Sequence, residues 1–270
     1  MLLVVDVGNT QTHFGTFEGD DLVEHWRFAT VRTSTADELG ATLRALLELR
    51  GIGLADLSAS IVASTVPSLE PEWVRMGRRY LAHETLAVGP GLRTGMPIRL
   101  DNPRELGADR LVNAVAAYDR VGGPVISVDF GTAVNYDVVS AKGEYLGGVI
   151  APGVEVSLDA LTTRGAKLPK IDLLAPRSAI GKSSVEAIRS GVIFGYAGQV
   201  DGLVARLQAE LGGPRATTIA TGGLAHAIVP HCTAIASTDD QLTLRGLKLL
   251  HERNRPDPAL PPSAEPAPAA

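Results

Sequence analysis

Hydrophobic and polar residues follow the same order in two separate stretches of the chain, residues 2–26 and 125–146. Each stretch begins with an apolar run, continues through an Asp-x-Gly turn that a hydroxyl residue follows closely, and then alternates between apolar and polar positions. A polar turn and a further apolar segment complete each stretch, and in the first of them that segment spans residues 22–26. The pattern predicts, twice, a buried strand followed by antiparallel strands joined by tight turns.

The remaining segments have mostly helical periodicity. Leucines spaced by four, three and one residues predict an amphipathic helix over residues 38–49, and further helices are predicted over 111–118 and 184–211. A short predicted strand over 217–220 ends in Thr221-Gly222-Gly223. Because strands and helices alternate along the chain, we expect an α/β fold.

The repeat implies two similar domains that face each other across a cleft. Asp6 and Asp129 occupy equivalent positions 123 residues apart. We therefore expect an N-terminal domain over residues 1–117 and a C-terminal domain over residues 118–255. Residues 256–270 are mostly proline and alanine without apolar periodicity, so they are predicted to form a disordered tail.

Composition narrows the classes of partner and compartment. Of 270 residues, 25 are Lys or Arg and 30 are Asp or Glu, so the net charge is −5 and no nucleic-acid partner is expected. The nearest approach to a basic cluster, Arg75, Arg78 and Arg79, has the spacing of a solvated helix face. The single cysteine, Cys232, excludes an internal disulfide and fits a reducing compartment. No apolar stretch approaches about 18 residues, so we expect a cytoplasmic protein with no membrane partner.

The repeated turns predict phosphate binding. A strand that ends in Asp and continues into a Gly-containing turn presents backbone N–H groups and a hydroxyl to one point, which suits phosphate oxygens. The Asp carboxylate repels phosphate but can hold a divalent cation such as Mg²⁺. One such turn is usually only a turn. Two copies in matching surroundings indicate a pair of turns that grip the two ends of a nucleoside triphosphate tail.

The set of motifs resembles the actin-like ATPase superfamily, which includes sugar kinases, and within it the type III pantothenate kinase family. The resembling segments run in the family's order from residue 2 to about residue 253. They are 6–10, 101–103, 107–110, 129–132, 147–153, 181–184 and 221–223. The resemblance implies two actin-like (ribonuclease H-like) domains related by the internal repeat, with the ATP cleft between them.

The resemblance also implies which residues bind ATP and a cation. The phosphates would be wrapped by the first turn and its flanks, Asp6, Val7, Gly8, Asn9, Thr10, Gln11, Thr12 and His13. Thr132 would contact ATP from the other side, and Gly222 and Gly223 would contact adenosine. Asp129 would hold a monovalent cation, K⁺ or NH₄⁺, which this family requires.

By the same resemblance, the pantothenate site would be lined by Gly107, Ala108, Asp109 and Arg110. Asp109 would be the general base, since a carboxylate can accept the proton of an alcohol during phosphoryl transfer. Its alternative is an ordinary acid at a helix start, where the helix dipole favours negative charge. Arg110 would pair with the pantothenate carboxylate, a bidentate match for a guanidinium. Its alternative is a surface ion pair.

Two further positions bear on the acceptor site. Ser184 stands where the family contacts pantothenate, often with Thr, and it keeps the hydroxyl. Leu100 stands where a substrate-facing Tyr usually precedes Asp-Asn-Pro. Because the phenolic hydroxyl is lost, Leu100 is the one feature that supports a kinase for another small hydroxyl or carboxyl substrate.

The resemblance therefore predicts ATP-dependent phosphorylation of pantothenate at its 4′-hydroxyl, the first step of coenzyme A synthesis. It further implies a homodimer with part of the substrate site at the subunit interface. Mg²⁺ is added on general grounds, because phosphoryl transfer needs charge neutralisation. An alternative of another class is a nucleotide-binding regulator that has lost catalysis. The survival of Asp6, Asp109 and Asp129 argues against it.

Overall fold

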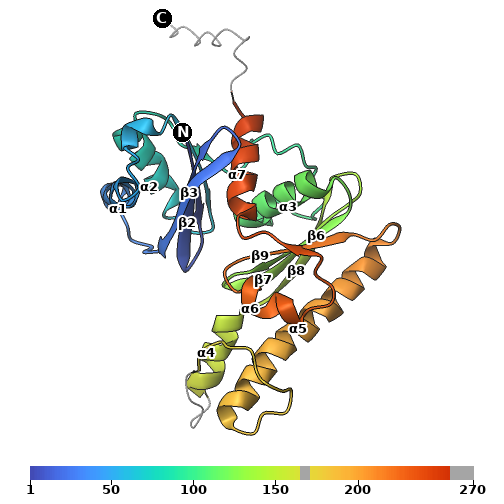
Figure 1. Ribbon diagram of the computed structural model, residues 1–270. Coiled ribbons are helices and arrows are strands. Elements are labelled where there is room, and N and C mark those ends of the chain that lie inside the picture. Colours follow the sequence, from blue (N-terminus) through green and yellow to red (C-terminus); the bar gives the residue numbers. More distant parts are fainter. Residues whose placement is uncertain (165–170, 256–270) are drawn as a thin grey trace, which may run out of the picture.

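The computed structural model describes residues 1–164 and 171–255 (Figure 1). The tail predicted over 256–270 lies outside the described residues. The first half of the chain forms β1 (Leu2–Val7), β2 (Gln11–Glu18), β3 (Asp21–Ala29), α1 (Ala36–Glu48), η1 (Leu54–Asp56), β4 (Ala59–Ser64), α2 (Glu70–Met76), η2 (Gly77–Leu81), β5 (Leu86–Ala87), η3 (Pro103–Glu105) and α3 (Ala108–Val121).

The second half repeats the strand pattern of the first half with different helices. It forms β6 (Val125–Phe130), β7 (Ala133–Val139), β8 (Tyr145–Pro152), α4 (Val154–Arg164), α5 (Ser184–Leu211), β9 (Thr217–Thr221), α6 (Ala225–Ile228), η4 (Val229–His231), β10 (Ser237–Thr238) and α7 (Leu242–Arg253). The predicted strands and helices are confirmed, although β3 continues three residues beyond the predicted end of its strand, to Ala29.

The two sheets have one topology, which confirms the internal repeat. The first sheet has the order β3-β2-β1-β4-β5 and the second has the equivalent order β8-β7-β6-β9-β10. In each, the first three strands in sequence are antiparallel neighbours, and the next two lie parallel to the first strand. The chain therefore has the two-sheet α/β architecture of the actin-like fold that its motifs predicted.

Each Asp-x-Gly turn is closed by a hydrogen bond from its glycine amide, and the second turn is one residue shorter than the first. The Gly8 amide donates to the Gln11 carbonyl over 3.1 Å, and the Gly131 amide donates to the Ala133 carbonyl over 3.0 Å. A Cβ at Gly8 would lie 2.9 Å from that Gln11 oxygen, so the first turn closes as tightly as it does only with glycine.

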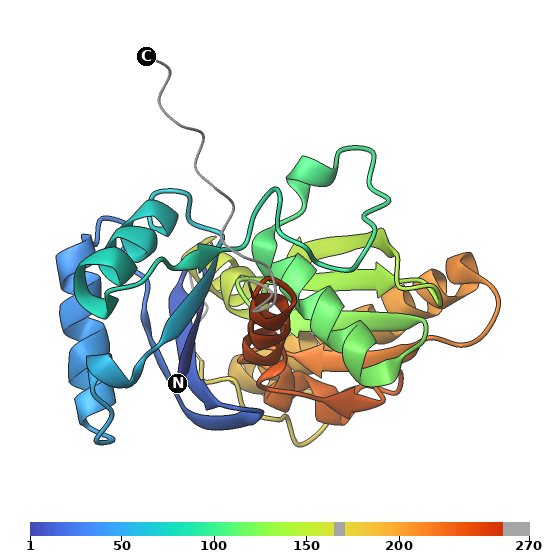
Figure 2. The same cartoon turned by 90° about the horizontal axis from the view of Figure 1, so that it is seen from above.

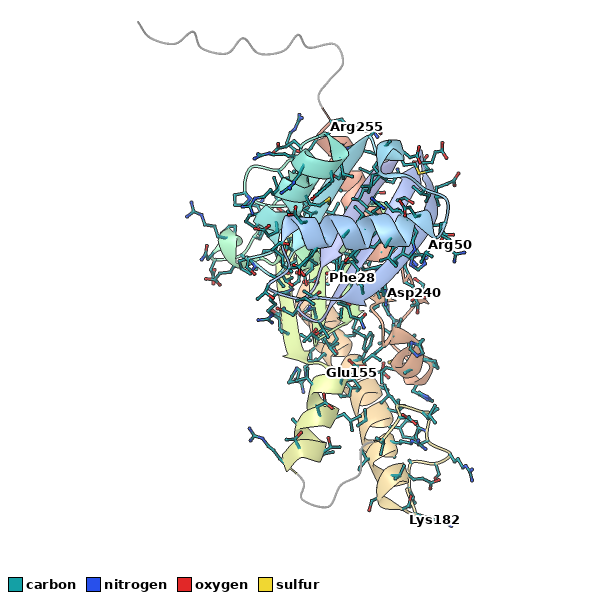
Figure 3. The ribbon with its side chains drawn as sticks, turned by 90° about the vertical axis from the view of Figure 1, so that its left-hand side faces the viewer. Phe28, Arg50, Glu155, Lys182, Asp240 and Arg255 are labelled. Atoms are coloured by element: carbon teal, nitrogen blue, oxygen red, sulfur yellow. The ribbon has the colours of Figure 1, made fainter. Side chains whose placement is uncertain are left out.

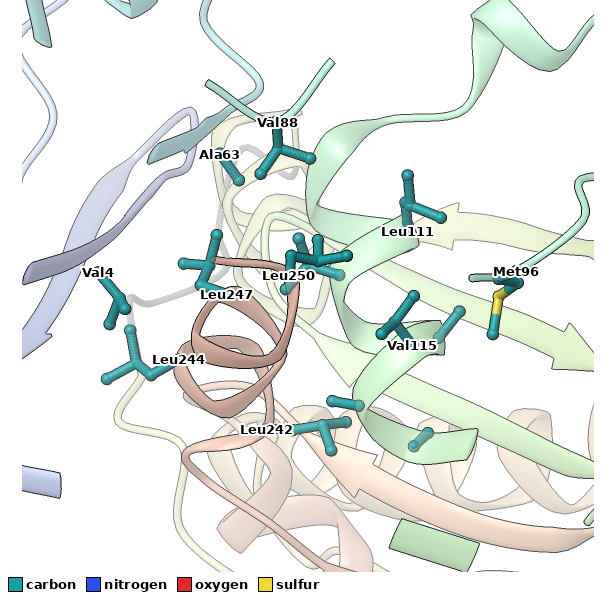
Figure 4. Close-up of a cluster of buried hydrophobic side chains, with 14 of the residues drawn as sticks. Val4, Ala63, Val88, Met96, Leu111, Val115, Leu242, Leu244, Leu247 and Leu250 are labelled. Atoms are coloured by element: carbon teal, nitrogen blue, oxygen red, sulfur yellow. The ribbon is translucent and has the colours of Figure 1, made fainter. Parts of the chain in front are cut away.

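Helices α3 and α7 follow the last strand of their respective sheets and pack against each other between the two sheets (Figure 2). Figure 4 shows the shared core, in which Val4 of the first sheet faces Leu244 and Leu247 of α7, and Val115 of α3 lies beyond them. This core joins the two sheets into one structure. The predicted domain boundary at residues 117 and 118 falls inside α3 and stays a prediction.

Helices α4 and α5 project from the second sheet away from the first. Figure 3 places Lys182, two residues before α5 begins, at the far end of this pair of helices. Along its length α5 buries Ile193 and Val200 in the core of the second sheet. Among the described residues, no helix is both long enough and apolar enough to cross a membrane.

The predicted basic face on the first domain is solvated, as expected. Arg75 pairs with Glu72, Arg78 with Glu84, and Arg79 with Asp37, all with largely exposed guanidinium groups. Each positive charge thus has an acidic neighbour, and these arginines do not form an unpaired basic patch.

Candidate active site

The two Asp-x-Gly turns meet between the two sheets. The hydroxyl of Thr10, from the first turn, lies 3.0 Å from the hydroxyl of Thr132, from the second. The Gly153 amide donates to the Thr132 carbonyl over 3.1 Å and thereby anchors the second turn. In the first turn, Arg32 donates from Nη2 to Asn9 Oδ1 over 3.0 Å. The structure therefore brings together the two turns that the sequence predicted to face each other.

The residues predicted to wrap the phosphates divide between a strand end, a turn and a strand start. Asp6 and Val7 end β1, and Gln11, Thr12 and His13 begin β2. Gly8, Asn9 and Thr10 form the turn between them. Thr12 is buried, and its hydroxyl lies 2.9 Å from that of Thr30. The exposed part of the motif is therefore the turn itself together with Gln11.

Asp6, Asp109 and Asp129 form a cluster of carboxyl groups between the two sheets. Burial raises the pKa of Asp6 well above its ordinary value, and the negative charges of Asp109 and Asp129 raise it further. Burial, followed by the charges of Asp109 and Asp137, raises the pKa of Asp129 to about 7. Because like charges oppose one another's ionisation, positive charge beside the three carboxyl groups favours their charged forms.

Asp109 has the helix-start position of its alternative role, and its role as general base stays a prediction. It lies in the first turn of α3, which begins after Gly107, so it is an acid at a helix start. Backbone amides at Asp109 and Arg110 hydrogen-bond to its carboxylate, but burial outweighs them and raises its pKa. It also faces the two aspartates of the repeated turns. A raised pKa makes its carboxylate a stronger base than one in water.

Asn113, which the sequence did not single out, ties this cluster to both interdomain helices. Its side-chain amide donates to Asp129 Oδ2 over 3.1 Å, and its carbonyl oxygen accepts the Thr243 hydroxyl of α7 over 2.7 Å. Asn113 is buried one helical turn after Asp109. That spacing places both side chains on one face of α3 and was a readable signal.

Arg110 forms a buried ion pair in place of the surface pair that was its alternative. Its Nε and Nη2 each lie 2.8 Å from Asp137 Oδ1, which also accepts the Tyr145 hydroxyl over 2.7 Å. The Asp137 side chain is 0% exposed and that of Arg110 15%. An acid inside a mostly apolar strand was the signal for this partner. The interaction with the pantothenate carboxylate stays a prediction for Arg110.

The glycine pair after β9 lies against the second turn. Gly222 has a φ of +94°, and a Cβ there would lie 2.5 Å from Asp129 Oδ1. Only glycine fits such a conformation at such a distance. Gly223 follows it and is exposed.

The remaining predicted substrate residues lie at different distances from this cluster. Gly107 and Ala108 begin α3 beside Asp109. Leu100 is half-buried, and its side chain packs against Gly147. Ser184 is the exposed first residue of α5, next to the far end of the projecting helices, and no contact joins it to the acidic cluster within the described chain.

The acidic cluster has the donor chemistry of a cation site. Oδ1 of Asp6 is buried without a hydrogen-bond partner in the described part of the chain, and a cation would satisfy it. Within residues 1–164 and 171–255, no group of three or more His, Cys, Asp or Glu side chains could hold a metal ion by itself. A cation here would therefore be completed by backbone oxygens, water or phosphate, as Mg²⁺ sites usually are.

Two facing Asp-x-Gly turns, a carboxylate with a raised pKa and a glycine pair, brought together between the two sheets, suit phosphoryl transfer from a nucleotide to an alcohol. Residues 2–206 match the sequence profile of the type III pantothenate kinase family. The chain belongs to that family. A type III pantothenate kinase of Moorella thermoacetica is 50% identical over 254 residues, which cover 94% of this chain and 100% of the relative. One of Streptomyces avermitilis is 51% identical over 261 residues, covering 94% and 98%.

More distant similarity concerns the fold alone. The structure of a candidate N-acetylglucosamine kinase from Porphyromonas gingivalis superposes with a TM-score of 0.53 at 15% identity, covering 94% of this chain and 99% of that chain. The type III pantothenate kinase family is thus identified from the sequence, and the actin-like architecture from the structure.

Proposed function

We propose that the protein transfers the γ-phosphoryl group of ATP to the 4′-hydroxyl of pantothenate, the first step of coenzyme A synthesis. The observation that carries this proposal is the position of Asp109, at the start of α3 beside the aspartates of both phosphate turns. Membership of the type III pantothenate kinase family supplies the acceptor.

The proposed mechanism assigns one task to each part of the cleft. The amides and hydroxyls of the two turns hold the phosphates, with Thr10 and Thr132 on opposite sides. Asp109 accepts the proton of the 4′-hydroxyl while the oxygen–phosphorus bond forms and the bond to the bridging oxygen breaks, releasing ADP. General-base assistance of this kind is worth about 10²–10⁴-fold. Alignment of the hydroxyl with the γ-phosphate supplies further rate.

Cations belong to the proposal because the cleft holds three acids and must accept a polyphosphate. Asp129 would hold K⁺ or NH₄⁺, with Asn113 fixing its carboxylate, and Asp6 would face Mg²⁺. When bound, these ions neutralise charge on the carboxylates and the phosphates. The acceptor side would be formed by Gly107, Ala108, Asp109, Arg110 and Leu100.

Turnover with pantothenate tests the assignment. ADP release should require pantothenate and Mg²⁺ and should fall when Na⁺ replaces K⁺. Phosphorylation of another small hydroxy acid in preference to pantothenate would point to Leu100 and a different acceptor. ATP binding without turnover under every cation would favour the silent regulator.

We further propose a homodimer formed through α4 and α5. Both helices project from the sheet, and Val156 and Leu161 on α4 are 46% and 44% exposed. Gly191 and Gly195 of α5 have open space where a side chain would stand. Such an apolar face can be covered by a second copy, which would bring Ser184 of the partner subunit toward a site that its own chain does not reach.

Complementation between two inactive variants tests this arrangement. Asp109→Asn and Ser184→Arg chains should each be inactive as homodimers. Mixed and reassembled, they should recover about a quarter of wild-type activity, because about half of the random dimers carry one intact site. If the dimers are shown to exchange subunits and no activity returns, the shared site is contradicted. Leu161→Glu should give monomers in light scattering.

A further inference from the structure

One cationic residue of the cleft has no part in the function derived above. Arg27 lies on β3, at the edge of the first sheet. Strand register places Asp6 opposite His13 and His13 opposite Arg27. Residues directly opposite one another on neighbouring strands share a face of the sheet. Arg27 therefore lies on the same face as Asp6, the face that looks into the cleft.

The Arg27 side chain reaches the second domain. Its Nη1 lies 3.3 Å from the position that a Cβ would occupy on Gly223. Gly222, the preceding residue, approaches the carboxyl group of Asp129. The guanidinium thus bridges the space between β3 and the glycine pair, on the side of the cleft predicted to hold adenosine and phosphates.

The hydrogen-bonding capacity of Arg27 is unused in the described part of the chain. Arg110 is held by Asp137 and Arg32 by Asn9, whereas no hydrogen bond or ion pair engages the guanidinium of Arg27 among those residues. A guanidinium carries five N–H donors in a planar fork that matches phosphate oxygens. Its donors face a cleft in which such oxygens are expected.

Arg27 is also the charged partner of a neutral histidine in this row of residues. Burial, and then the positive charge of Arg27, lowers the pKa of His13 to about 3, so His13 is neutral. Arg27 is therefore the positive charge of this row, beside three acids, in the part of the molecule that must admit a polyphosphate.

We propose that Arg27 binds the polyphosphate tail of the nucleotide, donating from the first sheet across the cleft to phosphate oxygens held between the Asp-x-Gly turns and Gly223. The inference rests on the proposed function, because it requires ATP in this cleft. Arg27 acts as a nucleotide-binding residue and neither accepts nor donates the transferred proton.

Binding measured without pantothenate tests the proposal. Arg27→Met keeps an apolar stem and removes the charge, and Arg27→Lys keeps the charge without the fork. Arg44→Met, on the exposed face of α1, is the matched control, since its pair with Glu48 is largely exposed. Titration calorimetry with ATP, ADP and adenosine should show a Kd for ATP raised about 10- to 100-fold in Arg27→Met.

The other ligands and variants separate a phosphate contact from a structural role. Adenosine binding should be unchanged in Arg27→Met, and Arg27→Lys should lie between wild type and Arg27→Met for ATP. In turnover, the KM for ATP should rise while the KM for pantothenate stays within about twofold.

Two results would overturn the inference. One is ATP binding by folded Arg27→Met that equals that of wild type. The other is an equal loss of ATP and adenosine binding, which would assign Arg27 to the fold. A wild-type chain that fails to bind ATP would instead refute the proposed function, so the two failures are distinguishable.

Discussion

A buried histidine beside the first Asp-x-Gly turn should make stability depend on pH in a defined way. His13 is 8% exposed on β2, and its Nε2 lies 3.3 Å from Nδ1 of the exposed His25. Burial is the largest cause that lowers its pKa to about 3, from an ordinary value of 6.5. The folded chain therefore keeps His13 neutral at pH 5, whereas the unfolded chain protonates it.

The size of the effect follows from proton linkage. The unfolded state binds more protons between about pH 6.5 and pH 3, so stability falls as the pH is lowered through this window. At pH 5 the difference between the two pKa values corresponds to about 2 kcal/mol, and at pH 7 to about 0.2 kcal/mol. Any folded-state pKa below about 4 gives nearly the same result at pH 5.

Comparison with His13→Gln isolates the contribution of His13 to the pH dependence of the free energy of unfolding. The raised pKa values of Asp6, Asp129 and Asp137 act in the opposite direction, so the pH profile of wild type alone is not diagnostic. Urea unfolding of both proteins at pH 7 and pH 5 should show the wild type losing about 2 kcal/mol relative to the variant. An unchanged difference would mean that His13 is protonated in the folded protein, and the charge balance assigned to Arg27 would then be wrong.

Two substitutions test the packing around the site. A Cβ at Gly246 of α7 would lie 2.7 Å from Val112 Cγ1 of α3 and closer still to the Val112 carbonyl oxygen. Gly246→Ala should therefore destabilise the protein by about 1–2 kcal/mol, even after the gain in helix propensity. The melting temperature should fall by about 2–8 °C. Gly202→Ala, on an open part of α5, should be neutral or stabilising, and equal melting temperatures for the two variants would contradict the close approach of α3 and α7. Asp137→Asn leaves the charge of Arg110 buried without an acidic partner. It should lower the free energy of unfolding, measured with urea, by about 3–5 kcal/mol. The double variant with Arg110→Met should regain part of that loss, and a single variant within about 1 kcal/mol of wild type would refute the buried pair.

Much of the fold could be predicted because the sequence contains an internal repeat, so the pattern in each half supports the interpretation of the other half. The stretches after residues 2 and 125 repeat an apolar run, an Asp-x-Gly turn and an alternating segment. The structure repeats one sheet topology to match. Asp6 and Asp129 were found for the same reason, because equivalent strand ends in a repeated fold face each other.

Residues whose partners depend on strand register or helix packing could not be predicted. The expected strand ended at Trp26, one residue before Arg27, so its row with Asp6 was not visible. The role of Asn113 depends on α7, which returns from the end of the chain to pack on α3. Asp137 was not predicted as the partner of Arg110, because alternation alone does not show that both faces of β7 are buried.

Chemical identification of the product tests the central claim most directly. Wild type and Asp109→Asn should be incubated with ATP, Mg²⁺, K⁺ and pantothenate, and phosphorylated pantothenate should be quantified by mass spectrometry beside ADP. We predict equal amounts of the two products from wild type. The rate in Asp109→Asn should fall by about 10²-fold or more, while its Kd for ATP stays within about twofold. Undiminished turnover by Asp109→Asn, or ADP formed by wild type without phosphorylated pantothenate, would contradict the account.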